Sequence, residues 1–128
     1  MKFIYKYARL PKNQKLLRNI DSAANGLFYK LRDLNIDMLN ISDYTKKYLT
    51  SKLFSFTTNL QLYSYILSWA LAETKVPFNE FVFLDYGGGT GMLSLLAKEI
   101  GIDTVIYNDI YDVSCRDAHQ IAESVGEM

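Results

Sequence analysis

The chain has 128 residues, of which 49% are hydrophobic and 22% are charged, and its formal net charge is zero. These values are ordinary for about one folded domain, so they exclude disordered, collagen-like and low-complexity chains. The single cysteine, Cys115, cannot form an internal disulfide, which is typical of a reducing compartment. The longest apolar-rich run, at 60–72, is too short and too polar to span a membrane. Residues 1–10 lack the apolar segment of a signal peptide, so we expect a cytoplasmic protein.

The two halves of the chain carry opposite charges. Residues 1–52 hold eleven Lys and Arg against four acids, a difference of +7, whereas residues 53–128 hold three against ten, a difference of −7. A basic arm can bind nucleic acid or an acidic partner, and opposite halves can also attract each other. Because no RNA- or DNA-binding signature accompanies the basic half, we do not expect nucleic acid as a partner. The basic half slightly favours an anionic substrate.

The spacing of apolar residues predicts a long helix from Asn13 onward. They recur every three or four residues along one helix face: Leu16, Leu17, Ile20, Ala23, Ala24, Leu27, Phe28, Leu31 and Leu34. Residues 35–40 read as a break. A short helix is then predicted to about Leu49, with Ser42 or Asp43 as its cap.

A second long helix is predicted over residues 58–74, with residues 57–59 as candidate caps and Pro77 enforcing its end. One side of it carries Leu60, Tyr63, Leu67, Ala70 and Leu71. We expect six residues of the helical half to be largely buried: Leu16, Ile20, Leu27, Leu60, Leu67 and Trp69.

The pattern changes at Phe78. From there the sequence predicts a buried strand at 81–84, a glycine-rich turn at 85–91, a helix at 92–100, a strand at 104–107, and a helix from Ser114 to about Val125. This order is the start of a βαβ unit, which has parallel strands and a right-handed crossover. The predicted fold class is therefore α/β.

The turn at 87–91 contains four glycines in five residues, and each glycine costs backbone entropy on folding. At the carboxyl end of a parallel strand, such glycines usually allow a ligand to approach the backbone closely. Asp109 follows the next strand, 18 residues after Gly91, where an acid can accept hydrogen bonds from two ribose hydroxyls. Together these features predict an adenosine-containing ligand; the alternative is a tight turn beside a surface acid.

The dinucleotide fingerprint G-x-G-x-x-G does not fit this turn, because its third glycine would fall on Met92 or Ser94. The pattern that fits is D-x-G-x-G-x-G, which begins at Asp85. A carboxylate in the turn would repel a pyrophosphate, but it can receive the ammonium group of an amino-acid ligand. S-adenosylmethionine has a ribose, an adenine and a zwitterionic tail without phosphate, so this charge pattern favours it over NAD.

At these residues, over about 81–126, the sequence resembles the class I S-adenosylmethionine-dependent methyltransferases. The resemblance covers the first two strand–helix units of that family's Rossmann-like sheet. It implies that the loop of Gly87, Gly89 and Gly91 wraps the methionine moiety, with Asp85 near its ammonium group. It also implies that Asp109 binds the ribose hydroxyls and that Ile110 lies against the adenine.

The resemblance further implies two units: a helical lid or extension over residues 1–77, and a partial Rossmann-like cofactor-binding domain over residues 78–128. A full domain of this family has seven strands, whereas two are predicted here, so the chain looks like the N-terminal portion of a methyltransferase. The implied mechanism is direct displacement of the sulfonium methyl by a substrate nucleophile, with the enzyme supplying proximity and alignment. The segment expected to carry a catalytic base is missing, so the catalytic residues are not identified.

An open two-stranded sheet is marginally stable and exposes its edges, so we expect self-association through the incomplete sheet. Two other functions stay open. One is a fragment of an NAD(P)-dependent oxidoreductase, which Met92 and Asp85 disfavour. The other is a non-catalytic interaction or dimerisation module with a vestigial nucleotide site.

Some residues resemble functional groups but have simpler interpretations. Cys115 and His119 could pair as metal ligands, but no further ligands lie near them in the sequence, so no metal is expected. Four tyrosines either line a substrate pocket or pack helices with their hydroxyls in water: Tyr44, Tyr48, Tyr63 and Tyr65. Three acids in the last helix are typical of a solvated face: Asp112, Asp117 and Glu123.

Overall fold

A computed structural model describes the backbone of residues 13–51 and 53–127, and the side chains of 13–50 and 59–127. The expectation about a signal peptide falls on residues 1–10, outside the described residues. The elements are, in order, α2 (Gln14–Arg32), the 3-10 helix η1 (Ile36–Met38), α3 (Asp43–Ser51), α4 (Leu53–Glu73), the 3-10 helix η2 (Phe78–Glu80), β1 (Val82–Tyr86), α5 (Met92–Glu99), β2 (Thr104–Asn108) and α6 (Asp112–Val125). The fold class is α/β, and most of the described residues are helical.

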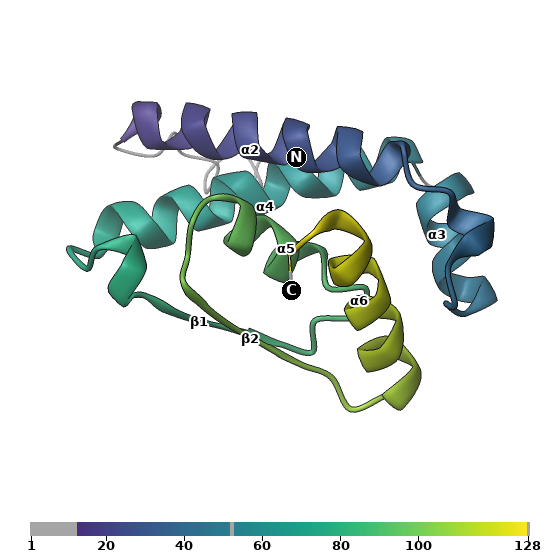
Figure 1. Ribbon diagram of the computed structural model, residues 1–128. Helices are drawn as coiled ribbons and strands as arrows, with labels where there is room; N and C mark the ends of the chain where they lie inside the picture. Colours follow the sequence, from purple (N-terminus) through teal and green to yellow (C-terminus); the bar gives the residue numbers. More distant parts are fainter. Residues whose placement is uncertain (1–12, 52, 128) are drawn as a thin grey trace, which may run out of the picture.

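The two strands pair in parallel, with Val82 opposite Thr104 and Tyr86 opposite Asn108. This confirms the predicted order of strand, glycine turn, helix and strand. Figure 1 shows the helices on one side of this sheet, with α5 and α6 next to the strands and α2 lying along α4 above them. The described helices therefore cover one face of the sheet and leave its other face open.

Helix α2 begins where predicted, because the Asn13 side chain accepts a hydrogen bond of 3.0 Å from the backbone nitrogen of Leu16. Its buried face, which consists of Ile20, Ala24, Leu27 and Leu31, packs against α4. Helix α4 buries Leu60, Leu67 and Leu71 together with two fully buried serines, Ser64 and Ser68. The serine hydroxyls donate to carbonyl oxygens of their own helix, so burying them leaves no hydrogen-bonding group unsatisfied.

The expected start of the second long helix was wrong. Helix α4 begins at Leu53, so residues 57–59 lie inside the helix and do not cap it. No glycine or proline interrupts the sequence between 53 and 73, and the helix therefore extends further toward the N-terminus. Of the six residues expected to be largely buried, Leu16 and Trp69 are half-buried, and Leu16 packs against the core. Ala70, placed with them on one side of the helix, is exposed.

Both predicted units contribute to one hydrophobic core. Leu27 of α2, Leu67 of α4, Leu96 of α5 and Ile121 of α6 belong to a single cluster of buried side chains. Ile20, Leu27, Leu60 and Leu67 are buried as predicted. The helical half therefore packs directly on the helices that flank the sheet.

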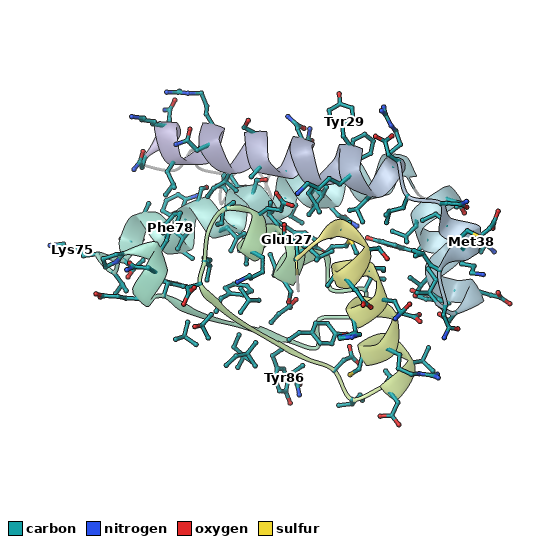
Figure 2. All side chains as sticks on the ribbon, viewed as in Figure 1. Tyr29, Met38, Lys75, Phe78, Tyr86 and Glu127 are labelled. Atoms are coloured by element: carbon teal, nitrogen blue, oxygen red, sulfur yellow. The ribbon has the colours of Figure 1, made fainter. Side chains whose placement is uncertain are left out.

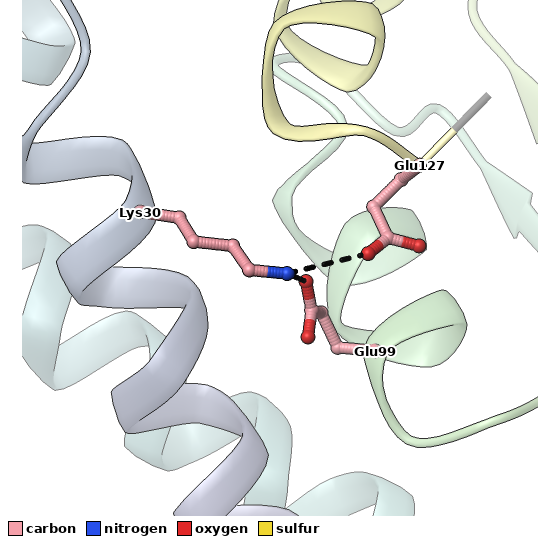
Figure 3. Close-up of polar contacts among 3 residues, drawn as sticks. All are labelled: Lys30, Glu99 and Glu127. Carbon is pink, nitrogen blue, oxygen red and sulfur yellow. Dashed lines mark hydrogen bonds and ion pairs between the residues drawn. The ribbon is translucent and has the colours of Figure 1, made fainter.

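A lysine of α2 forms ion pairs with two glutamates of the second half of the chain (Figure 3). Lys30 Nζ of α2 lies 2.5 Å from Glu99 Oε1 at the end of α5, and 3.7 Å from Glu127 Oε1 beyond α6. The hydrogen bond to Glu99 raises the pKa of Lys30. Burial, with Glu99 beside it, raises the pKa of Glu127. The ammonium group thus joins α2 to the end of α5 and to the segment after α6.

Helix α6 differs from the prediction at two points. It begins at Asp112, and Ser114 is not its cap. Asp117 was expected on a solvated face, but it is only 3% exposed. It accepts hydrogen bonds from the backbone nitrogen of Ser42, at 3.0 Å, and from the hydroxyls of Ser42 and Thr45, at 2.5 and 2.6 Å. The prediction failed because these partners are more than seventy residues away in the sequence.

The open face of the sheet is largely apolar, with the polar side chains of Thr104 and Asn108 at the two ends of β2. Val82, Leu84 and Tyr86 of β1 are 62%, 56% and 81% exposed, and Ile106 of β2 is 48% exposed. Figure 2 shows Tyr86 pointing away from the helices. The expectation of buried strands is therefore correct for one face only. None of the helices in the described residues has the length and apolar character that a bilayer crossing requires.

Candidate functional site

The glycine-rich turn connects the carboxyl end of β1 to the first residue of α5. Three of its glycines, the ones singled out in the sequence, have positive φ: Gly87 (69°), Gly89 (55°) and Gly91 (81°). Gly91 is the N-cap of α5, and a Cβ atom built on it would lie 3.0 Å from the Cβ of Ala118 in α6. Its conformation and its contact with α6 both favour glycine at this position.

Gly88 is required for a different reason, which sequence reasoning missed. Its φ is not positive, but a Cβ atom there would lie 2.6 Å from the Tyr107 ring and 2.8 Å from Asp85 Oδ2. The Tyr107 hydroxyl donates a hydrogen bond of 2.5 Å to the carbonyl oxygen of Gly89, so the ring is held against the loop. Burial, followed by the nearby Asp109 carboxylate, raises the pKa of Tyr107. The unbroken glycine run was the available signal, but nothing in the sequence indicated that a tyrosine packs under it.

Asp85, the last acid before the loop, is 7% exposed. Its Oδ2 accepts hydrogen bonds from the backbone nitrogen of Ser94, at 3.2 Å, and from the Ser94 hydroxyl, at 2.7 Å. Ser94 lies in the first turn of α5, whose N-cap Gly91 makes no side-chain capping bond. Asp85 therefore satisfies a backbone donor of this helix end from the preceding strand. The prediction that it lies near the ammonium group of a ligand stays a prediction.

Asp109 follows β2 and lies beside the loop. Its Oδ2 accepts a hydrogen bond of 2.9 Å from the backbone nitrogen of Gly89, and its Oδ1 accepts one of 2.9 Å from that of Tyr111. These backbone bonds, the one from Tyr111 first, lower the pKa of Asp109, so its carboxylate is ionised at neutral pH. A carboxylate has about four lone-pair sites, so it can accept further hydrogen bonds from a ligand. Ile110, next to it, is 81% exposed.

The residues predicted to bind a cofactor thus gather at one edge of the sheet. Gly87, Gly89 and Gly91 follow β1, Asp109 and Ile110 follow β2, and one hydrogen bond joins the two segments. Asp85 lies beneath them and faces α5. The arrangement leaves an ionised carboxylate and an exposed apolar side chain next to a loop with little side-chain bulk.

On the helical side of the loop, a hollow of about 610 Å³ lies between the glycines, α3, α4 and the start of α6. Three of the four tyrosines considered as pocket residues line it, namely Tyr44, Tyr48 and Tyr63. Tyr65 lines a separate hollow between α2 and α4. Burial, with Tyr48 and Asp85 nearby, raises the pKa of Tyr63, so its hydroxyl keeps its proton.

Within the part of the chain that the structure describes, Cys115 and His119 are not joined by a third metal-ligating side chain. The Cys115 thiol lies 3.6 Å from the carbonyl oxygen of Asp109, and His119 is exposed. Among the described residues, no three His, Cys, Asp or Glu side chains are grouped so that they could hold a metal ion.

Comparison with known proteins identifies no relative of this chain. No family model matches the sequence, and neither the curated proteins nor the solved structures contain a significant match.

Proposed function

We propose that this chain binds S-adenosylmethionine and belongs to an S-adenosylmethionine-dependent methyltransferase with a Rossmann-like fold. The observation that carries the proposal is the hydrogen bond from the Gly89 backbone nitrogen to Asp109 Oδ2. It holds an ionised carboxylate against a glycine loop at the carboxyl edge of two parallel strands, which is where such sheets bind ligands.

The contact between Asp85 and Ser94 supports S-adenosylmethionine over a dinucleotide. A pyrophosphate binds to the free backbone N–H groups at the start of the helix that follows the glycine loop. Here one of these groups, the backbone nitrogen of Ser94, already donates to the Asp85 carboxylate. The same carboxylate adds a negative charge under the loop, which opposes a pyrophosphate and suits a ligand with an ammonium group.

The proposed roles are assigned from the positions of the residues around the loop. Gly87, Gly89 and Gly91 admit the methionine moiety, Asp109 accepts hydrogen bonds from the ribose hydroxyls, and Ile110 offers an exposed apolar surface to the adenine. Bound S-adenosylmethionine would supply the methyl group, and the protein would contribute proximity and alignment. The single free cysteine suits the cytoplasm, which we propose as the location.

Calorimetric titration of the 128-residue chain with S-adenosylhomocysteine, S-adenosylmethionine and NAD tests this proposal. We expect the first two to bind and NAD not to bind. Asp109→Asn should weaken binding of S-adenosylhomocysteine at least ~10-fold, because the ribose hydroxyls lose a charged acceptor. The matched control is Asp103→Asn, which removes an exposed carboxylate just before the opposite end of β2 and should leave the affinity unchanged.

Equal affinities of the two variants would remove Asp109 from the ribose site. Binding of NAD alone would favour the oxidoreductase alternative. A folded chain that binds none of the three ligands would overturn the proposed function.

An interaction function is also supported by one specific observation, the exposed apolar face of the sheet. Parallel sheets are usually covered on both faces, yet Val82, Leu84 and Ile106 face away from the described helices. We propose that the chain self-associates through this sheet, in addition to binding a cofactor. Exposed apolar patches of this kind commonly mark interaction sites.

A further inference from the structure

The hollow beside the glycine loop is rich in tyrosine. Four tyrosines line it: Tyr44 and Tyr48 from α3, Tyr63 from α4, and Tyr111 just before α6. Its volume of about 610 Å³ lies in the range of sites for small molecules. Tyr44 and Tyr111 are 72% and 66% exposed, so their rings are accessible to a ligand at the mouth, whereas Tyr48 and Tyr63 are half-buried.

The charged groups of this hollow are all negative. Asp112 and Asp117 line it, and no Lys, Arg or His among the described residues does. Burial opposes ionisation of Asp117, but the hydrogen bonds from Ser42 and Thr45 outweigh it, so the pKa of Asp117 lies below its usual value. Asp112 is exposed in the first turn of α6. An anion in the hollow would therefore meet two carboxylates, and Arg116, which lies near Asp117, is not among the described residues that line the hollow.

Electron-rich rings and carboxylates are the groups that proteins use to bind organic cations. A cation over the face of a tyrosine is attracted by the ring quadrupole, and several rings around one site add to this attraction. The neutral polar groups of the hollow, such as Asn59, whose Nδ2 lies 3.5 Å from the Tyr48 hydroxyl, add hydrogen-bonding capacity without charge. The walls thus combine attraction for a cation with exclusion of an anion.

This result differs from the expectation of an anionic substrate that the basic first half suggested. Lys30 of α2 is engaged with Glu99 and Glu127, away from this hollow. Lys46 and Lys47 belong to α3, but they are not among the residues that line the hollow. The described basic residues of the first half therefore do not create a positive site beside the glycine loop.

We propose that the hollow formed by Tyr44, Tyr48, Tyr63, Tyr111 and Asp112 binds a small organic cation, and that this cation is an amine that accepts the methyl group. The binding site stands on the lining residues alone, whereas the acceptor role rests on the proposed function. In that role the ammonium first loses a proton to water at the open mouth. The nitrogen lone pair then forms the new N–C bond, while the S–C bond to the methyl breaks and its electron pair stays on sulfur. The products are the methylammonium and S-adenosylhomocysteine.

Asp117 is a positioning residue for this site. Its hydrogen bonds to Ser42 and Thr45 fix the start of α3, from which Tyr44 and Tyr48 project toward the hollow. Without them, α3 would lose its polar connection to α6. The cation site therefore depends on a contact between two helices that come from different halves of the chain.

The experiment uses choline and its neutral isostere 3,3-dimethyl-1-butanol as probes, with binding to the 128-residue chain followed by NMR. We expect choline to bind at least ~10-fold more tightly than the isostere, because the two differ in charge and not in shape. Tyr44→Leu and Asp112→Asn should each weaken choline binding ~3- to 10-fold and leave the isostere unchanged. Tyr29→Leu and Asp103→Asn are matched controls at exposed positions outside the hollow and should bind choline normally.

A second titration with choline, at saturating S-adenosylhomocysteine, separates this inference from the proposed function. We expect the two ligands to bind together. Displacement of choline by S-adenosylhomocysteine would overturn the inference, because the hollow would then belong to the cofactor. Equal affinity for choline and the isostere, or choline binding unaffected by both variants, would also overturn it. Choline binding without any binding of S-adenosylhomocysteine would support the cation site and overturn the acceptor role together with the proposed function.

Discussion

Thr45 Oγ1 donates a hydrogen bond of 2.6 Å to the carboxylate of Asp117, and this contact ties α3 to α6. The Ser42 backbone nitrogen and hydroxyl donate to the same carboxylate, which is buried. Burial alone would raise the pKa of Asp117, but these hydrogen bonds, with Arg116 nearby, lower it. The ionised carboxylate therefore stabilises the folded state, and the loop between α2 and α3 is held against the sheet-flanking helices.

The first prediction concerns the pH dependence of this contact. Because the pKa of Asp117 is lower in the folded than in the unfolded chain, its contribution is complete above the unfolded value of about 3.9 and is lost as the pH falls through the folded value. At pH 7, Asp117→Asn should lower the free energy of unfolding by about 1–3 kcal/mol, the cost of leaving buried donors poorly satisfied. Urea denaturation at several pH values measures this difference.

The difference between the unmodified chain and Asp117→Asn should shrink as the pH falls below about 4, because the unfolded chain then binds a proton at Asp117. It should vanish below the lower pKa of the folded chain, where both proteins carry a neutral group at this position. Glu123→Gln is the control, since it removes an exposed carboxylate from the same helix and should have little effect at any pH. A difference that does not vary between pH 7 and the acidic limit would contradict the ionised state of Asp117.

The second prediction concerns the core between the helices and the sheet. Leu67 of α4 is 1% exposed and packs in the cluster to which all five described α-helices contribute, so Leu67→Ala should cost about 2–5 kcal/mol. Leu62→Ala on the same helix is the control, because Leu62 is 52% exposed and its loss should change stability by less than about 0.5 kcal/mol. Thermal unfolding followed by circular dichroism compares the two. Similar melting temperatures for both variants would reject this packing.

The third prediction concerns Gly88. Gly88→Ala should destabilise the chain and weaken any ligand binding at the loop, because the new methyl group would meet the Tyr107 ring and the Asp85 carboxylate. Gly26→Ala is the matched control: it lies inside α2 with no atom near its Cβ position, and should stabilise the chain by about 0.5–1 kcal/mol. A Gly88→Ala chain as stable as Gly26→Ala would show that the ring does not pack under the loop.

The sequence predicted the order of the elements, and with it the position of the glycine turn and of Asp109 at the ends of the strands, because these depend on local pattern. Apolar spacing defined α2, and the alternation of strand, glycine turn and helix located β1, α5 and β2 to within two residues. Contacts between segments far apart in the chain were not predictable in this way. The burial of Asp117 depends on Ser42 and Thr45, and the need for Gly88 depends on Tyr107, and neither partner is implied by the residues around it.

The tyrosines that line the hollow were predictable only in part. The sequence indicated which tyrosines could serve a pocket, but it could not place them against the glycine loop, since that needs the packing of α3 and α4 on the sheet. The same limit applies to charge. The basic half suggested an anionic substrate, yet the lining residues of the hollow carry only negative charges among the described residues.

The last prediction concerns self-association through the open face of the sheet. Val82, Leu84 and Ile106 present exposed apolar side chains, and Asp85, the charged residue of β1, is buried. Water contact with such an apolar surface is unfavourable. Leu84→Glu should weaken self-association, because a charge at the centre of this face would have to be desolvated when two copies meet. Sedimentation velocity over a range of chain concentrations measures the distribution of monomers and larger species.

Leu62→Glu, which places the same charge at a similarly exposed leucine of α4, should leave the association unchanged. Both variants should keep the melting temperature of the monomer, since both sites already face water. If the unmodified chain sediments as a monomer at every concentration, or if Leu62→Glu disrupts the association as strongly as Leu84→Glu, the sheet face is not the surface through which the copies meet.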